Sequence, residues 1–220
     1  MKINSVTPVL VIAMGFTISL LIFRIYYSAS LMYLFFVWNL FLAALPLKIN
    51  VHLSKAKNKI IQWMLFALWL LFFPNSLYVF TDFVHLKERY PVPLWFDAIL
   101  VFSAAMNGLV LAYLSLHQIE IFLKSKFSHN KSTLIVYASL FLSSFGIYLG
   151  RFLRMNSWDI ISNPAGIIFQ VFDRVVNPFE HPRTWGMTIV FTGFFSIFYY
   201  TMKTLPNLII KKSIYESKMV

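Results

Sequence analysis

The chain has 220 residues, of which 59% are hydrophobic and 12% are charged; its formal net charge is +11 and its mean hydropathy is +0.71. Soluble domains carry about 25% charged residues, so this composition excludes an ordinary soluble domain and predicts an integral membrane protein. The chain lacks cysteine, which excludes disulfides and thiolate chemistry, and in so apolar a chain the positive charge indicates topology signals and contact with anionic lipid rather than nucleic acid binding.

Six apolar segments follow one another along the chain, and each is long enough to cross a bilayer as a helix of about 20 residues. They cover residues 6–23, 27–46, 60–80, 94–116, 134–153 and 184–205. The short connection between the first two predicts a tight helical hairpin. No small-residue cleavage site follows the first segment, which we therefore expect to be a retained helix rather than a signal peptide. We predict an all-α fold, a polytopic membrane helical bundle that forms a single domain over residues 1–220.

A shorter helix is predicted between the fifth and sixth segments, at residues 164–176. Asn163-Pro164 is typical of a helix start and Asn177-Pro178 of a helix stop. Its polar side chains fall on one strip, and the rest of the helix is apolar. A helix of this length is too short to span the bilayer. We expect an amphipathic helix in the outer interface, where it could form a lid over polar groups.

The basic residues indicate the orientation. Twelve lysines fall on one side of the predicted bundle, whereas Lys87 and all six arginines fall on the other. The positive-inside rule makes the lysine side cytoplasmic, which predicts a multi-pass protein of the cell membrane with both termini in the cytoplasm. Six of the eight acidic residues share the arginine side: Asp82, Glu88, Asp97, Asp159, Asp173 and Glu180. Polar chemistry is therefore predicted at the extracytoplasmic face.

The stretch PNSLYVFTDFVHL, residues 74–86, gathers polar groups at the end of the third segment. Pro74 removes a backbone hydrogen bond, and Asn75 could satisfy the broken region near Leu70. At about 100° per residue, the polar side chains of this stretch share an arc of about 80°; they are Asn75, Tyr78, Asp82 and His85. Asp82 and His85 would be helical neighbours. Such a pair can orient a catalytic base, support a metal-bound histidine or form a structural ion pair.

The fourth segment opens with Asp97, which shares a helical stripe with Ala104, Gly108 and Ala112. Small residues four apart allow two helices to approach closely. Asp97 is therefore predicted to point into the bundle, where it could pair with an arginine or approach the third segment. Asn107 is predicted to form an interhelical hydrogen bond rather than to bind a ligand.

Two arginines near the end of the fifth segment, Arg151 and Arg154, are three residues apart. They could extend from the helix end toward water, pair structurally with the acidic residues, or clamp a phosphate or carboxylate such as a lipid headgroup. Asn156 and Asp159, which follow directly, would cap or orient such a clamp, and Trp158 lies on the same side as the two arginines.

Three motifs taken together, PNSLYVFTDFVHL, WFDAIL and GRFLRMNSWD, resemble the bacterial membrane family called domain of unknown function 1361. The resemblance runs from the second to the sixth segment and implies a bacterial inner-membrane protein. The shared residues that it implies are Pro74, Asn75, Tyr78, Thr81, Asp82, His85, Asp97, Gly150, Arg151, Arg154, Asn156, Ser157, Trp158 and Asp159. It implies no activity, because the name of the family states none.

The first functional hypothesis is a site that binds or processes a lipid or lipidated substrate at the outer leaflet. His85 would be the general acid or base, oriented by Asp82, with Tyr78 as a second proton donor. The candidate substrate or anion ligands are Arg151, Arg154, Asn75, Asp97, Asn156, Trp158 and Asp159. We assign no metal and no cofactor. G-x-S-x-G and H-E-x-x-H motifs do not occur, so an enzyme would more reasonably transfer an acyl or head group.

Two other hypotheses stay open. The protein could be a non-catalytic membrane partner or assembly protein whose polar cluster is structural, or a small-solute transporter. The mid-membrane region is poor in charge, and broken helices do not occur as a pair in two halves, which argues against the transporter. In the site hypothesis, the third, fourth and fifth segments converge, so that five side chains form one cluster: Asp82, His85, Asp97, Arg151 and Arg154.

Overall fold

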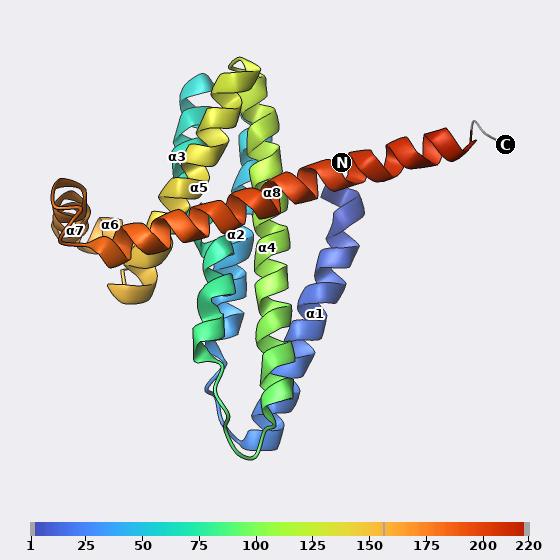
Figure 1. Cartoon of the computed structure of the whole chain (residues 1–220), viewed down its shortest axis with the longest axis vertical. Helices are drawn as coiled ribbons and strands as arrows, with labels where there is room; N and C mark the ends of the chain where they lie inside the picture. Colours follow the sequence, from blue (N-terminus) through green and yellow to red (C-terminus); the bar gives the residue numbers. More distant parts are fainter. Residues whose placement is uncertain (1–2, 156, 218–220) are drawn as a thin grey trace. The chain divides into compact units, whose positions relative to one another are not determined.

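A computed structural model of the chain describes residues 3–155 and 157–217, in which the regular structure is all helical (Figure 1). The chain divides into two compact units, Met1–Ser125 and Lys126–Val220. The all-α fold is therefore confirmed, and one membrane domain over residues 1–220 stays a prediction.

The described part of the first unit, residues 3–125, contains four α-helices and one 3₁₀-helix. They are α1 (Ile3–Ser28), α2 (Phe35–Lys55), α3 (Lys59–Tyr78), η1 (Val79–His85) and α4 (Leu94–Lys124), drawn from blue to green in Figure 1. α2 packs against α3 and α4, and α4 also packs against α1 and η1. Apolar side chains such as Phe36, Leu40 and Leu100 form the core between these helices.

The second helix differs from its predicted range of 27–46. Ala29 has φ of 50°, a left-handed conformation that ends α1, and the following turn delays α2 to Phe35. α2 also continues past Pro46, which lies buried inside it. The turn residues are themselves apolar, so hydropathy gave no signal for either boundary.

The small-residue stripe of α4 lies in the core, as predicted. Asp97, Ala104, Gly108 and Ala112 are all buried. A Cβ at Gly108 would lie 2.6 Å from the carbonyl oxygen of Ser76 and 3.0 Å from Cβ of Val79. α4 therefore approaches the backbone at the end of α3 at a distance that only glycine permits there.

The second unit contains α5 (His129–Phe152), α6 (Asp159–Ser162), α7 (Pro164–Val176) and α8 (Pro182–Ser217). α5 packs against α8, and α6 against α7. α7 has the predicted range. The side-chain Oδ1 of Asn163 accepts a hydrogen bond of 3.0 Å from the N–H of Gly166 and so caps its start. α6 was not predicted.

Five helical segments in the described residues are long and apolar enough to cross a membrane. They are Pro8–Ser28, Phe35–Lys55, Lys59–His85, Leu94–Lys124 and His129–Phe152. α8, which corresponds to the predicted sixth segment, is not among them; threonine, serine and tyrosine are frequent in it. The structure therefore supports a multi-pass membrane protein, and the sixth span stays a prediction.

Candidate functional site

A buried ion pair joins α1 to the first turn of α4. Arg24 Nε donates to Asp97 Oδ1 at 2.9 Å, and Nη2 donates to Oδ2 at 3.2 Å. The two side chains are 2% and 1% exposed. This two-point geometry is the strong form of an arginine–carboxylate contact. Asp97 therefore pairs with an arginine, as the sequence allowed, but its partner is Arg24, a residue that the sequence did not mark as part of the site.

Tyr33 lies beside this pair, in the turn between α1 and α2. The Arg24 guanidinium carbon is 4.5 Å from the centre of the Tyr33 ring, a cation–π contact. The Tyr33 hydroxyl donates to the carbonyl oxygen of His85 at 3.2 Å. Burial raises the pKa of the Tyr33 phenol, as does the Asp97 carboxylate, while Arg24 and Arg89 lower it. Tyr33 thus connects the ion pair to the end of η1.

Asp82 and His85 lie on η1 rather than on a continuous α-helix. The chain tightens into a 3₁₀-helix after Tyr78, so the expected α-helical face over residues 75–85 is wrong beyond Tyr78. With three residues per turn, positions three apart eclipse one another, which still aligns Asp82 with His85. Asp82 is buried and accepts a hydrogen bond of 3.0 Å from Asn39 Nδ2.

The other residues of this stretch have local contacts. The His85 ring packs edge-on against Phe35, with ring centres 5.2 Å apart. Asn75 Nδ2 donates to the carbonyl oxygen of Phe72 at 2.9 Å, whereas the carbonyl that Pro74 leaves without its helical donor is that of Leu70. The backbone carbonyl of Tyr78 accepts from Thr81 Oγ1 at 2.7 Å. The ion pair, the tyrosine beside it and the two titratable residues of η1 together form what we call the η1 cluster: Arg24, Tyr33, Asp82, His85 and Asp97.

A cavity of about 350 Å³ adjoins the η1 cluster between α1 and the start of α4. Its lining includes Phe23, Arg24, Tyr27, Pro93, Trp95 and Phe96. The rings of Phe23 and Phe96 have centres 5.4 Å apart. We call this space the upper cavity. Its volume lies within the range of small-molecule sites, about 300–1,000 Å³, which combine apolar walls with a few placed polar groups.

Polar side chains also tie α1 to α4 further along the two helices. Asn107 Nδ2 donates to the carbonyl oxygen of Ala13 at 3.1 Å and to Thr17 Oγ1 at 2.8 Å. Thr17 Oγ1 and Ser103 Oγ share a hydrogen bond of 2.6 Å. The predicted interhelical role of Asn107 is therefore confirmed.

The arginines of the fifth segment lie in the second unit and do not share a helix face. Arg151 is in the last turn of α5 and is half-buried, whereas α5 ends at Phe152. Arg154 is exposed and has φ of 57°, because the chain turns out of the helix there. The helical premise of the clamp is therefore wrong, and the role of the two arginines as anion ligands stays a prediction.

The residues after Arg154 lead into α6. Trp158 is exposed and precedes α6. Asp159 is the first residue of that helix, and its Oδ1 accepts from Ser162 Oγ at 3.2 Å. Asn156 lies outside the described residues. The proposed convergence of Arg151 and Arg154 with Asp82, His85 and Asp97 stays a prediction.

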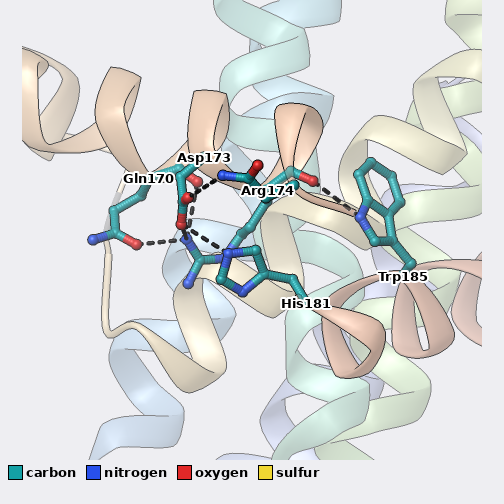
Figure 2. A network of polar contacts seen from close by, with 6 residues as sticks. Gln170, Asp173, Arg174, His181 and Trp185 are labelled. Carbon is teal, nitrogen blue, oxygen red and sulfur yellow. Dashed lines mark hydrogen bonds and ion pairs between the residues drawn. The ribbon is translucent and has the colours of Figure 1, made fainter. Parts of the chain in front are cut away.

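A second polar network joins α7 to α8 (Figure 2). His181 Nε2 lies 2.8 Å from Asp173 Oδ2, and Arg174, which is 6% exposed, donates from Nη1 to the carbonyl oxygen of Gln170 at 2.9 Å. Trp185 Nε1 donates to the carbonyl oxygen of Arg174 at 3.1 Å. The helical period of the sequence predicted the polar strip on α7. It could not predict that His181 and Trp185 contact this strip, because both residues follow the end of the helix.

The opposite side of α7 is an exposed apolar face. Its large side chains are more than half exposed: Ile168, Phe169, Phe172, Val175 and Val176. With the polar strip, in which Arg174 is buried, this apolar face makes α7 the predicted amphipathic helix.

Asp173 makes the second network sensitive to acid. The hydrogen bond from Asn177 and, to a smaller extent, the one from His181 lower the pKa of the Asp173 carboxyl group. The carboxylate therefore contributes its full stabilisation above the usual aspartate pKa of about 3.9, and this stabilisation is lost as the pH falls through the lowered pKa. We expect the Tm in detergent to fall more steeply between about pH 5 and pH 3 for the parent than for Asp173→Asn. Equal slopes would show that the network contributes no stability; Glu180→Gln, at an exposed carboxylate, is the control.

The described residues contain no group of three or more His, Cys, Asp or Glu side chains that could hold a metal ion. Residues 38–198 match the model of a family described as "Protein of unknown function (DUF1361)". No curated protein and no solved structure matches the chain.

Proposed function

Because the chain belongs to the DUF1361 family, whose description assigns no activity, we propose a function from the η1 cluster itself. The protein is a polytopic protein of the bacterial inner membrane that binds a lipid or lipidated substrate at its extracytoplasmic face. The observation that carries this proposal is the upper cavity, where aromatic walls meet the buried guanidinium of Arg24.

Arg24 retains donors for a ligand. A guanidinium has five N–H groups; two of those of Arg24 bond Asp97 and a third, on Nη1, bonds Ser28 Oγ at 3.3 Å. Two N–H groups thus have no acceptor among the described residues. A phosphate or carboxylate oxygen is their natural partner. Tyr27 and Trp95, which line the same cavity, are the side chains that favour the level of lipid headgroups.

Lipid binding is tested with the full chain, delipidated in detergent and mixed with phosphatidylglycerol, by native mass spectrometry. Tyr27→Ala combined with Trp95→Ala removes two exposed aromatic walls, so folding should be preserved and binding should fall at least about tenfold, or about 1.4 kcal/mol. Tyr26→Ala is the control, since Tyr26 is 88% exposed and does not line the cavity. A parent protein that retains no lipid, or a double variant that binds like the parent, would refute the proposal.

Processing of the bound lipid is the second candidate, favoured by the alignment of His85 with buried Asp82 on η1. His85 would act as general acid or base, Asp82 would orient it and Tyr78 would be the second proton donor. We retain as candidate ligands Asn75, Asp97, Arg151, Arg154, Asn156, Trp158 and Asp159. His85→Gln should fold normally yet fail to complement a deletion strain, and full complementation would remove His85 from the chemistry.

A non-catalytic partner or assembly role is the alternative. It is favoured by the two hydrogen bonds between Arg24 and Asp97, because the same geometry is expected of an ion pair whose role is purely structural. A folded parent protein without lipid or activity would select this alternative.

The proposed orientation places both termini in the cytoplasm. The natural chain has no cysteine, so single cysteines at Ser54 and Ser162, both exposed, can be labelled without background. We expect a membrane-impermeant maleimide to label the Ser162→Cys variant in intact cells and to label the Ser54→Cys variant only after permeabilisation. Labelling of both from the same side would contradict this topology.

A further inference from the structure

The contact between α1 and α4 forms a regular seam with polar links at three levels in the described residues. From the upper cavity onward, these links pair Arg24 with Asp97, Thr17 with Ser103, and Ala13 with Asn107. Residue numbers fall along α1 as they rise along α4, which shows that the helices run antiparallel. Asp97 and Asn107 are ten residues apart, or about 15 Å along a helix. That length is half of the roughly 30 Å hydrocarbon core of a bilayer.

A second cavity, of about 380 Å³, lies further along the same seam. Its lining includes Val9, Ala13, Phe16, Phe102, Met106 and Asn107. We call this space the deep cavity. The polar groups of Thr17, Ser103 and Asn107 bond one another, so the wall offered to a ligand is apolar.

The two cavities open on the same side of the α1–α4 pair. On α1, Phe23 lines the upper cavity, and Phe16 and Val9 line the deep one. On α4, Phe96 lines the upper cavity and Ser103 the deep one. On each helix, successive lining residues of this set are seven positions apart, which is nearly two helical turns, so they lie on one face of the helix.

The end of the seam at the upper cavity carries the charge that suits an anionic headgroup. Arg89 is near this end: its carbonyl accepts from the N–H of Val92 at 3.0 Å, and Val92 lines the upper cavity. Arg89 Nε is buried and has no hydrogen-bond partner among the described residues. With the two spare N–H groups of Arg24, this end offers guanidinium donors for a phosphate.

We propose that the two cavities hold one phospholipid of the extracytoplasmic leaflet, with its phosphate at Arg24 and an acyl chain that follows the seam to Met106. This inference rests on the proposed lipid binding and adds to it a binding site for the acyl chain, which we call the chain site. A partner helix is a poorer occupant, because its diameter of about 10 Å exceeds what a cavity of about 380 Å³ can enclose along the seam.

The test offers the delipidated full chain an equimolar mixture of dioctanoyl and dipalmitoyl phosphatidylglycerol in detergent, and native mass spectrometry counts each bound lipid. We expect the parent to prefer the long-chain lipid at least about tenfold, or about 1.4 kcal/mol. Met106→Trp and, independently, Val9→Trp fill the deep cavity from partly exposed positions. Each should bring the preference to near equality while binding of the short-chain lipid persists.

Leu68→Trp is the matched control, because Leu68 is partly exposed on α3 and lines neither cavity; it should keep the long-chain preference. Equal binding of both lipids by the parent, or an unchanged preference in both filling variants, would overturn the chain site and leave lipid binding intact. Absence of both lipids from the parent would instead overturn the proposed function. A dimer without long-chain preference would assign the seam to a second copy.

Discussion

Replacement of Asp97 by alanine is expected to lower the free energy of unfolding by about 3–5 kcal/mol, the usual cost of removing one partner from a buried ion pair. Arg24 would keep its charge at 2% exposure with no carboxylate to balance it. Because the free energy of unfolding of a native protein is typically only about 5–15 kcal/mol, this loss should be visible as a lower Tm in detergent. Glu88→Ala, at an exposed acid of the same unit, should change stability by less than about 0.5 kcal/mol.

The double variant Arg24→Met/Asp97→Leu separates the cost of an unpaired charge from the worth of the pair. Apolar replacement of both partners is often neutral or stabilising, so we expect the double variant to recover most of the stability that Asp97→Ala loses. The same variant should lose phospholipid binding, because it lacks the guanidinium in the upper cavity. If Asp97→Ala were no less stable than Glu88→Ala, Asp97 would not hold a buried charge in place.

Gly108→Ala is expected to destabilise the first unit by about 1–3 kcal/mol through overpacking. The added Cβ would approach a backbone carbonyl to 2.6 Å, and backbone cannot move aside as a flexible side chain can. Alanine gains about 1 kcal/mol of helix propensity over glycine, which offsets only part of this cost. Thermal unfolding in detergent gives the measurement.

Gly15→Ala is the matched control for Gly108→Ala, since it is also a glycine inside a helix of the first unit. A Cβ at Gly15 meets nothing within 4 Å, so its substitution should leave stability unchanged or raise it by up to about 1 kcal/mol. Equal effects at the two positions would contradict the close approach of α4 to the end of α3.

The sequence predicted those parts of the fold that depend on local signals. The bounds of α7 are correct because Asn163-Pro164 and Asn177-Pro178 mark its ends directly. The buried stripe of α4 is also correct, since small residues at helical spacing have few other uses in a membrane helix. The start of α2 was missed because the turn before it is as apolar as the helices that it joins.

The candidate site was harder to predict because it depends on contacts between distant residues. Arg24 follows an apolar run and looks like a helix-end charge until Asp97, 73 residues later, is placed beside it. Tyr33 lies in a turn that the sequence assigned to a helix. The change to a 3₁₀-helix after Tyr78 has no distinct composition. The residues of the stretch 74–86 were identified by their polarity, but their partners were not.

The most direct test of lipid binding in the upper cavity uses the fluorescence of Trp95, which lines it. The delipidated full chain is titrated with phosphatidylglycerol brominated near the headgroup end of its acyl chains, and Trp95→Phe and Trp38→Phe are titrated alongside. Trp38 is 53% exposed on α2 and does not line the cavity. The proposal predicts saturable quenching at one lipid per chain, lost in Trp95→Phe and kept in Trp38→Phe. Quenching that never saturates, or that is the same in both variants, would show that lipid contacts the surface without occupying the cavity.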